Sequence, residues 1–435
     1  MKIAVIGAGL AGCEAAYLLL KNGYNVTLFE MKPKKFTPAH QLPSYGELVC
    51  SNSLKTLRDN HPQGMLKDEL IKVKSLIISK AFESRVPAGD SLAVNREILS
   101  KLVTDALLQF KNLKIVTTEV SNLPESFDYY IVATGPLTTP LFSKYLSDLL
   151  GSEGLYFYDA IAPIVDYETI DKSKVFFGSR YGKGGDDFLN IPLTREEYYN
   201  FVRELNNAEK VVLRQFEEEK YYEGCLPIEV LAKRGVDTLA YGPLKPVGFD
   251  DKVIGFKPYA LIQLRREDKE GTAYNIVGFQ TKLTIPEQER VFRLIPGLNN
   301  VKFLRYGSIH RNTFINARKY LLPTLNLKMR PNIFFAGQIT GVEGYVESIT
   351  TGFLAALFLI HLANGTFLSL PSRRTAFGAL LSHLQGDPEN FQPSGIHLGL
   401  FDKEKLKSKS ERLQNILENE KKDFSVWLDK VQNIL

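Results

Sequence analysis

The N-terminal segment alternates short apolar runs with a helical stretch, and this pattern predicts its structure. Ile3–Ile6 is an apolar run whose length suits a buried strand. Strong helix formers fill Glu14–Lys21, and Asn22–Gly23 then supplies residues that commonly end a helix. Asn25–Phe29 again has the β-branched and aromatic residues of a strand. The order strand, helix, strand predicts a βαβ unit and therefore a parallel sheet.

Two later apolar runs repeat this pattern of a strand followed by a glycine-containing turn. Tyr129–Val132 predicts a strand that leads into the turn ATGP. The apolar run at Asn332–Ala336 predicts another strand, which leads into the turn GQITG. The residues that follow, Val346–Leu362, have the composition of a long apolar helix. The most apolar run, Phe353–Ala363, is too short to span a bilayer, so we expect no membrane segment.

The composition of the chain changes between residues 166 and 300, where charged and aromatic residues dominate. At 435 residues the chain exceeds the size at which one core usually stops growing, so two domains are expected. We predict an α/β fold in which a first domain, residues 1–165 and 301–402, is interrupted by an α+β domain at residues 166–300. Apolar residues recur at helical spacing in residues 403–435, which predicts an amphipathic helix that packs on its own domain rather than on a partner or a membrane.

The turn after the first strand contains the pattern GxGxxG, which binds dinucleotides when it joins a strand to a helix. Gly7 allows the tight turn, Gly9 lets the backbone approach a diphosphate, and Gly12 lets the helix pack closely on the strand. The diphosphate then lies at the helix N-terminus, where free N–H groups and the helix dipole stabilise an anion. Glu30, at the end of the second strand, suits a ribose hydroxyl. The sequence has no second GxGxxG for a nicotinamide cofactor, so NAD(P)H is expected to bind only transiently.

Composition narrows the class of protein. Hydrophobic residues make up 44% and charged residues 24%, which is typical of a globular protein and excludes a disordered chain. Three scattered cysteines exclude a disulfide framework and favour the reducing cytoplasm. The six histidines form no HxxxH or CxxH pattern, so no metal site is expected. The net charge of +5 is compatible with a polyanionic partner such as RNA but does not require one.

Two of the three cysteines lie in polar, turn-like sequence rather than in apolar elements. Cys50 precedes Ser51–Ser53, residues that favour the N-cap of a helix, so we expect its thiol at a helix N-terminus. A helix dipole there stabilises a thiolate and lowers the pKa of the thiol. Cys225 follows a glycine in YYEGCLPIE, within the predicted inserted domain. Spacing alone leaves both thiols open between reactive groups and buried fillers, whereas Cys13, beside the glycine turn, is expected to be a buried small residue.

The order of these motifs resembles the glutathione-reductase-type FAD-binding fold, and longer stretches resemble one family within it. They are GAGLAGCEAAYLL, TPAHQ, ELVCSNSLK, VPAGDSLAV, YYIVATGPLT, LYFYDAIAPIV, EGCLPIEVLAKRG, YGPLKPVG, YNIVGFQT, HRNTFIN and FFAGQITGVEGYVES. In this order they resemble the TrmFO family of folate- and FAD-dependent tRNA (uracil-5-)-methyltransferases, from residue 1 to about residue 402. The longer GidA/MnmG proteins are more distant relatives with the same flavin fold and folate chemistry.

This resemblance implies methylation of carbon 5 of the T-loop uridine of tRNA, at position 54, with 5,10-methylenetetrahydrofolate as the one-carbon donor. It also implies reduced FAD as reductant and NAD(P)H as the source of electrons. Cys225 is expected to attack carbon 6 of uracil, and Cys50, near the flavin ring, to act as general base. His310 and Tyr345 are expected to stack on the pterin of the folate. The expected FAD-binding residues are Gly7, Ala8, Gly9, Leu10, Ala11, Gly12, Glu30, Ala133, Gly135, Gly337 and Gln338.

Some features differ from the family or leave alternatives open. Where the family usually has a cysteine in an N-C-P run, this chain has Ile191, and residues 403–435 extend beyond the matching motifs. Some relatives act on 23S ribosomal RNA, and a generic FAD oxidoreductase also fits the flavin motifs, so both remain alternatives. No obligate protein partner is evident from the sequence. The candidate contacts for RNA phosphates are Lys233, Arg234, Arg265, Arg266, Arg311, Arg318 and Lys319.

Overall fold

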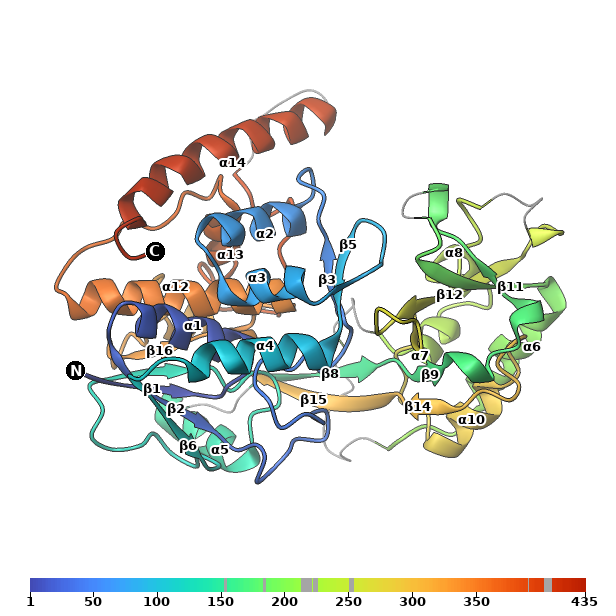
Figure 1. Ribbon diagram of the computed structural model, residues 1–435, viewed down its shortest axis with the longest axis horizontal. Helices are drawn as coiled ribbons and strands as arrows, with labels where there is room; N and C mark the ends of the chain where they lie inside the picture. The colour runs from blue at the N-terminus through green and yellow to red at the C-terminus, as the bar shows by residue number, and fades with distance from the viewer. Residues whose placement is uncertain are drawn as a thin grey trace.

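A five-stranded parallel sheet forms the centre of the first domain (Figure 1). The structure is a computed structural model that describes residues 1–151, 155–182, 185–212, 221, 226–249, 254–389, 391–402 and 409–435. The strand order is β16-β7-β1-β2-β6. These strands are β1 (Lys2–Ile6), β2 (Asn25–Glu30), β6 (Leu113–Thr117), β7 (Tyr129–Val132) and β16 (Ile333–Phe335). The predicted βαβ unit and the two later strands therefore lie in one sheet, and the predicted α/β class is confirmed.

The apolar character of these strands follows from their burial on both faces. Ile131, Val132 and all three residues of β16 have no exposed surface, as expected for a parallel sheet that is covered on both sides. Helix α1 (Leu10–Lys21) packs directly on α12 (Tyr345–Ala363) above the sheet. The two helices approach closely at Gly352, where a Cβ atom would lie 2.3 Å from the carbonyl oxygen of Ala11. A glycine is therefore required at this crossing.

Helix α12 is the core helix of the first domain. Among the described residues it alone is long and apolar enough to cross a membrane, with a mean hydropathy of 1.7. However, 83% of its most apolar window is buried inside the protein. Its apolar composition is therefore explained by its position between α1, α2 (Pro62–Lys72) and the sheet.

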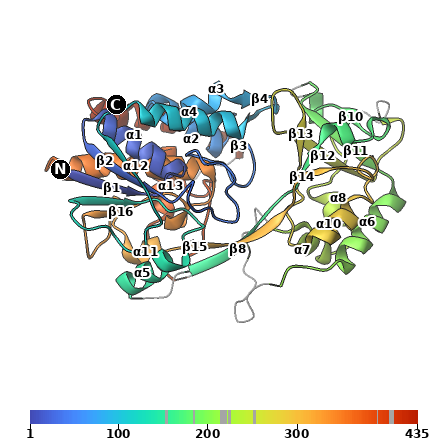
Figure 2. The same ribbon diagram turned by 60° about the horizontal axis from the view of Figure 1, so that its bottom comes forward.

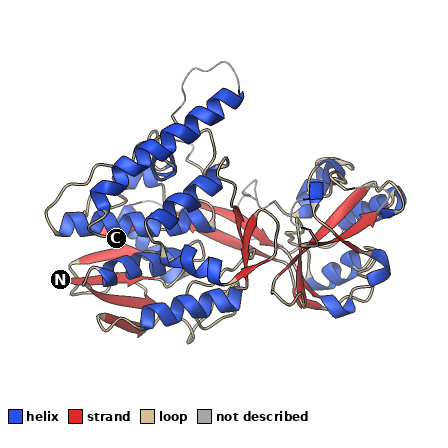
Figure 3. Cartoon of the chain, turned by 45° about the horizontal axis from the view of Figure 1, so that its top comes forward, coloured by secondary structure: helices blue, strands red, loops and turns tan. Residues whose placement is uncertain are grey.

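The rest of the first domain surrounds this centre with helices and a small sheet (Figure 3). The further helices are α3 (Leu76–Glu83), α4 (Arg96–Leu108), α5 (Pro140–Leu150), α11 (Ala317–Tyr320) and α13 (Ala376–His383), and a 3-10 turn, η5 (Gln338–Thr340), precedes α12. The small antiparallel sheet consists of β3 (Ser53–Thr56), β5 (Ser91–Val94) and β4 (Arg85–Val86). This sheet lies at the side of the domain that faces the second domain.

The second domain is built on a six-stranded antiparallel sheet with its own hydrophobic core. Its strands are β9 (Ile164–Asp166), β10 (Phe176–Phe177), β11 (Phe188–Leu193), β12 (Ala260–Arg266), β13 (Ala273–Ile276) and β14 (Phe303–Arg305). Its helices are α6 (Arg195–Asn207), α7 (Ile228–Lys233), α8 (Thr238–Tyr241) and α10 (Ile285–Phe292), with 3-10 turns η1 (Tyr167–Thr169), η2 (Lys172–Lys174) and η3 (Arg180–Gly182). Ile191 is fully buried in this core, opposite Ile262 of the neighbouring strand. The position that is usually cysteine in the family is therefore a packing position in this chain.

A two-stranded antiparallel ribbon connects the two domains (Figure 2). Strand β8 (Leu155–Ile161) leads toward the second domain, and β15 (Ser308–Phe314) returns from it. The two strands are paired along their whole length, from Leu155 opposite Phe314 to Ile161 opposite Ser308. This pairing brings His310 directly opposite Asp159.

The C-terminal helix α14 (Lys409–Val431) packs on the first domain, as predicted. Phe424 and Trp427 both contact the ring of Phe377 in α13, with ring centroids 5.4 and 5.8 Å away. The indole N–H of Trp427 donates to the carbonyl oxygen of Ser369 at 3.0 Å. The apolar stripe of this helix is therefore explained by contacts within the chain.

Candidate active site

The glycine turn between β1 and α1 has the conformation that the GxGxxG pattern predicts. Gly7 has a φ of +98°, and a Cβ atom there would lie 2.5 Å from the carbonyl oxygen of Ala133. A Cβ atom on Gly12 would lie 1.8 Å from the carbonyl oxygen of Gly7. Both glycines are therefore needed for close packing of the turn against β7 and α1.

Gly9 differs from its two neighbours because its missing side chain faces open space. No atom of the described chain lies within 4 Å of the position of its Cβ. Gly9 is also the N-cap residue of α1, and it provides no side-chain hydrogen bond to the helix. The free N–H groups and the dipole of α1 therefore point into this space, which suits a diphosphate.

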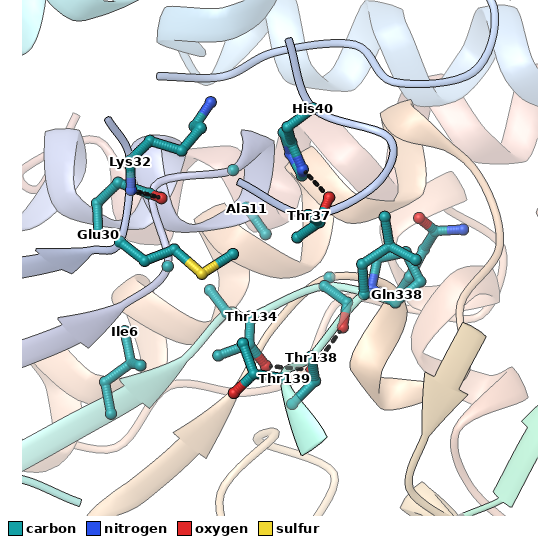
Figure 4. Close-up of a pocket in the computed structure, with 18 of the residues that line it drawn as sticks. Ile6, Ala11, Glu30, Lys32, Thr37, His40, Thr134, Thr138, Thr139 and Gln338 are labelled. Atoms are coloured by element: carbon teal, nitrogen blue, oxygen red, sulfur yellow. Dashed lines mark hydrogen bonds between the residues drawn. The ribbon is translucent and has the colours of Figure 1, made fainter. Parts of the chain in front are cut away.

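The space at Gly9 belongs to a first cavity, and Glu30 lines this cavity next to the glycine turn in a fixed orientation (Figure 4). Its Oε2 accepts a hydrogen bond from the backbone N–H of Ala8 at 2.9 Å, and its Oε1 accepts one from Lys32, also at 2.9 Å. The ammonium group of Lys32 in turn forms a buried ion pair with Glu47 at 3.2 Å. Each carboxylate oxygen of Glu30 keeps further acceptor capacity, which a ribose hydroxyl could use, and its role in cofactor binding stays a prediction.

The opposite wall of this first cavity comes from the turns after β7 and β16. Ala133 and Gly135 follow β7, and Gly337 and Gln338 follow β16. The φ angles of Gly135 and Gly337 are +67° and +81°, a region that favours glycine. His40 also lines the cavity, and burial lowers the pKa of its imidazole to about 3, so the ring is neutral. The first cavity therefore combines an anion-binding helix terminus with an acidic residue, Glu30, and an uncharged imidazole.

A second cavity of about 350 Å³ adjoins the first, and its volume is within the range of small-molecule sites. It is lined by Cys50, His310 and Tyr345, which lie far apart in the sequence. The residues that line both cavities are Val49, Pro136, Leu137, Gln338 and Tyr345. A ligand in the first cavity can therefore contact a ligand in the second, and Cys50 lies next to their junction.

The prediction that Cys50 lies at a helix N-terminus is wrong, because the residues after it form strand β3. Their hydroxyl groups bind nearby backbone instead of capping a helix. The Oγ of Ser51 accepts from the N–H of Ser53 at 3.0 Å, and the Oγ of Ser53 accepts from Lys55, also at 3.0 Å. No helix dipole therefore acts on the Cys50 thiol from this segment.

The position of the Cys50 loop is determined by contacts from both domains. The hydroxyl oxygen of Tyr345 accepts a hydrogen bond from the backbone N–H of Cys50 at 2.7 Å. From the second domain, Arg265 donates to the Oγ of Ser51 at 2.8 Å and to the Oδ1 of Asn52 at 2.9 Å. Asn52, which is fully buried, donates in return to the carbonyl oxygen of Arg266 at 2.8 Å. The loop therefore depends on the docking of the second domain.

His310 and Tyr345 both present uncharged rings to the second cavity. Burial, together with the charge of Arg305, lowers the pKa of His310 to about 4, so its imidazole is neutral. Its Nε2 lies 2.9 Å from the Oγ of Ser308. Burial and the neighbouring Cys50 raise the pKa of Tyr345, so its hydroxyl stays protonated. Neutral rings of this kind can stack on a heterocycle, in keeping with the role expected for both residues.

Cys225 lies outside the described residues, so its predicted role as nucleophile stays a prediction. The nearby residue Tyr221 lies beside Tyr158 of β8, with the ring centroids 6.5 Å apart. Cys13 has no exposed surface, and its thiol is 3.2 Å from the carbonyl oxygen of Ala8. Burial raises the pKa of Cys13, so this thiol is inert at neutral pH.

The sequence analysis missed several polar residues of the second cavity. They are Lys55, Gln63, Asp159, Asn312, Glu343 and Glu347. All of them except Gln63 lie in stretches that were already singled out: Lys55 in ELVCSNSLK, Asp159 in LYFYDAIAPIV, Asn312 in HRNTFIN, and Glu343 and Glu347 in FFAGQITGVEGYVES. Within those stretches nothing local marks them as lining one cavity, and Gln63 belongs to no such stretch.

Three of the basic residues proposed as RNA contacts are engaged within the protein. Arg265 binds the Cys50 loop, as described above. Arg318 donates to the carbonyl oxygens of His383 and Asp387, both at 3.0 Å. The guanidinium of Arg311 lies over the ring of Tyr156 at 4.2 Å. These contacts give all three arginines a structural explanation that does not require RNA.

Comparisons with known proteins identify the family of this chain. The family described as glucose inhibited division protein A matches residues 2–366. The methylenetetrahydrofolate–tRNA-(uracil-5-)-methyltransferase TrmFO of Sulfurihydrogenibium sp. (strain YO3AOP1) is 48% identical over 435 residues, which cover 100% of this chain and 99% of the relative. The protein of the same name from Pelobacter propionicus is 51% identical over 433 residues, 99% of this chain and 95% of the relative.

A solved structure shares the fold. Aquifex aeolicus GidA, in its form I crystal, has a TM-score of 0.68 and covers 98% of this chain and 76% of its own, at 16% identity. The chain therefore has a known fold, and the resemblance inferred from the motifs is confirmed. This chain belongs to the TrmFO family, within the wider family of glucose inhibited division protein A.

Proposed function

We propose that this chain is a flavin-dependent methylenetetrahydrofolate–tRNA-(uracil-5-)-methyltransferase that methylates the T-loop uridine at position 54. Relatives that carry this enzyme name match the chain over its full length. The observation that carries the proposal is the junction of the two cavities. It brings Cys50, His310 and Tyr345 together beside a dinucleotide site, although these residues lie on three separate segments.

The first cavity fits FAD. The space at Gly9 suits the diphosphate, Glu30 suits a ribose, and Gly337 and Gln338 line the end that opens into the second cavity. When bound, reduced FAD supplies the two electrons that convert a methylene group into a methyl group, and NAD(P)H restores it. The 5,10-methylenetetrahydrofolate would occupy the second cavity, with its pterin against His310 and Tyr345.

The thiol of Cys225 has the chemistry needed to activate uracil. Its thiolate forms a bond to carbon 6 of the ring, and the electron pair of the 5,6 double bond moves into an enolate. Carbon 5 then attacks the methylene carbon of the folate, and one of the two carbon–nitrogen bonds of that carbon breaks. Loss of the proton from carbon 5 expels the second folate nitrogen and leaves a methylene group on the ring. Addition of two electrons and a proton to this group, with departure of the thiolate, gives 5-methyluracil and tetrahydrofolate.

Cys50 is the group that we propose accepts the proton from carbon 5. It lines the second cavity, and its backbone is held by Tyr345 while its neighbours are held by Arg265. A rigid loop is useful for a base that must lie within hydrogen-bond distance of one carbon atom. The target uridine must also leave the folded T loop to reach this cavity, at a cost of a few kcal/mol.

A T-loop minihelix that carries 5-fluorouridine tests this assignment. Fluorine cannot leave carbon 5 as a proton does, so the covalent adduct accumulates. Enzyme loaded with FAD and supplied with methylenetetrahydrofolate and NADPH should form a complex that survives a denaturing gel. Cys225→Ala should form none, whereas Cys50→Ala should still form it, because proton removal follows addition.

Cys13→Ala is the matched control, since Cys13 is a buried thiol that lines neither cavity. Adduct formation by Cys225→Ala would refute the assignment of Cys225 as the nucleophile. Loss of the adduct in Cys13→Ala would show that the assay responds to the stability of the protein rather than to the nucleophile. Mapping 5-methyluridine in tRNA and 23S rRNA from a deletion strain separates the two RNA substrates. Methylation lost only from rRNA would contradict the proposal.

A further inference from the structure

The second cavity contains buried oxygen acceptors that have no donor. Glu343 and Gln63 are 7% and 3% exposed, and both line this cavity. Neither the Oε2 of Glu343 nor the Oε1 of Gln63 has a hydrogen-bond partner in the described part of the chain. A buried polar atom without a partner costs about 1–3 kcal/mol, so native proteins rarely keep one without a reason. Both oxygens therefore point to a ligand that donates hydrogen bonds.

Both acceptors are held rigidly by their other contacts. The Oε1 of Glu343 accepts from the side-chain amide of Gln338 at 2.8 Å, and the backbone N–H of Glu343 donates to Ser394 at 2.9 Å. The side-chain amide of Gln63 donates to Glu347, whose carboxylate also accepts from the N–H of Ile396 at 2.9 Å. Because these contacts restrict rotation, the free oxygens are already oriented before a ligand binds.

The surroundings of Glu343 disfavour its ionised form unless a donor is bound. Burial and the nearby carboxylate of Asp159 raise the pKa of Glu343 to about 8. Asp159 lines the same cavity from strand β8, and Lys55 lines it from β3. A ligand that offers two adjacent N–H groups would satisfy Glu343 in its ionised form, because a carboxylate accepts a paired donor through both oxygens.

The three heterocycles of the proposed reaction differ in the donors that they offer. Uracil and the flavin ring each present a single N–H between two carbonyl oxygens. A reduced pterin instead presents its 2-amino group next to the N–H at position 3. The free acceptors of Glu343 and Gln63 therefore favour the paired donors of the pterin over the carbonyl groups of the other two rings.

We propose that Glu343 is a specificity-determining residue that binds the 2-amino and N3–H donors of the reduced pterin, with Gln63 as a second acceptor. This inference rests on the proposed function and extends it. It directs the pterin edge toward the turn between η5 and α12, with the pterin ring against His310 and Tyr345, and it leaves the side of the cavity lined by Cys50 for the nucleobase.

The test compares two folates on FAD-loaded protein. The probes are 5-formyltetrahydrofolate, which is chemically stable, and its 2-desamino-2-methyl counterpart, which lacks the amino donor. Titration calorimetry on wild-type protein should give roughly 10- to 100-fold weaker binding of the second probe, the effect of one hydrogen bond to a charged group. Glu343→Gln should lose a similar factor for the first probe and should no longer discriminate between the two.

Two further variants keep the test interpretable. Glu343→Asp retains the carboxylate and should retain part of the discrimination. Glu14→Gln changes another buried carboxyl, which binds Ser75 and the backbone of Leu76 and lines neither cavity, and it should bind both probes within about twofold of the wild-type values.

The inference is overturned if Glu343→Gln discriminates between the probes as the wild type does, or if wild-type protein binds both equally. If wild-type protein methylates the minihelix while either result holds, only the role of Glu343 fails. If FAD-loaded wild-type protein binds neither folate and transfers no methyl group, the proposed function fails together with it.

Discussion

The glycine turn allows packing and ligand binding to be separated by two single substitutions. Gly9→Ala places a methyl group in the open space at the start of α1, where no described atom lies within 4 Å. Gly12→Ala places the same group 1.8 Å from the carbonyl oxygen of Gly7. The first substitution should therefore affect FAD alone, and the second should affect the fold.

The magnitudes follow from the local geometry. Gly9 has a φ of −75°, so alanine fits its backbone, and the entropy lost by the unfolded chain stabilises the variant by about 0.4–1 kcal/mol. Alanine is a poorer N-cap than glycine by a similar amount, so the stability of the apoprotein should change by less than about 1 kcal/mol. A methyl group in the path of the diphosphate should cost about 1–3 kcal/mol, or roughly 10- to 100-fold in FAD affinity.

For Gly12→Ala the clash is with backbone, which cannot rotate away. The helix or the turn must shift by more than an ångström, and we expect a loss of about 3 kcal/mol or more in the free energy of unfolding. Urea denaturation of the apoproteins measures stability, and equilibrium dialysis measures FAD affinity.

Two results would refute this reasoning. One is a Gly9→Ala variant that retains FAD affinity within about twofold of the wild-type value. The other is a Gly9→Ala apoprotein that is destabilised as much as Gly12→Ala, which would mean that the open space at Gly9 is not a ligand site.

Three further predictions concern stability. Burial raises the pKa of Glu420 and of its neighbour Glu69, so the folded protein favours the protonated form of both carboxyl groups. Their contribution to the free energy of unfolding is fully present below the ordinary glutamate pKa and is lost as pH rises through the folded pKa. The Tm of Glu420→Gln, relative to wild type, should therefore increase from pH 5 to pH 8, and a constant difference would contradict this. Trp427→Ala removes a buried ring of α14 and should lower the free energy of unfolding by about 3–5 kcal/mol. Hydrogen exchange should therefore accelerate in α14 but not in the parallel sheet. Arg96→Met leaves Glu267 as an unpaired buried charge between the domains. The free energy of unfolding, measured by urea denaturation, should fall by about 3–5 kcal/mol, and the double variant Arg96→Met/Glu267→Leu should recover most of this loss.

Much of the first domain could be predicted because its elements are specified locally. The runs Ile3–Ile6 and Tyr129–Val132 are continuously apolar, which is the pattern of a strand buried on both faces. The turn at Gly7–Gly12 has its own spacing, and each glycine in it has a steric or ligand-related reason. The apolar stripe of α14 likewise identified the surface that packs on α13.

The wrong prediction at Cys50 shows where local reasoning fails. Ser51 and Ser53 have side chains that can cap a helix or bind a turn equally well. The outcome was decided by the pairing of β3 with β5, which is remote in the sequence. The acceptors of the second cavity were missed for the same reason, since Gln63 and Glu343 become neighbours of one cavity only after the domain has folded.

The inserted domain affects when the protein can acquire its cofactor during synthesis. Strands β9 to β14 lie within Ile164–Arg305, a continuous stretch that can fold as it leaves the ribosome. The sheet of the first domain instead needs β16, and the junction of the two cavities needs Tyr345, both of which are translated after that stretch. A nascent chain therefore completes its second domain while the flavin site is still missing one edge strand and one wall. Cofactor loading must follow translation of α12, so a chain that stops before β16 would contain a folded domain but no enzyme.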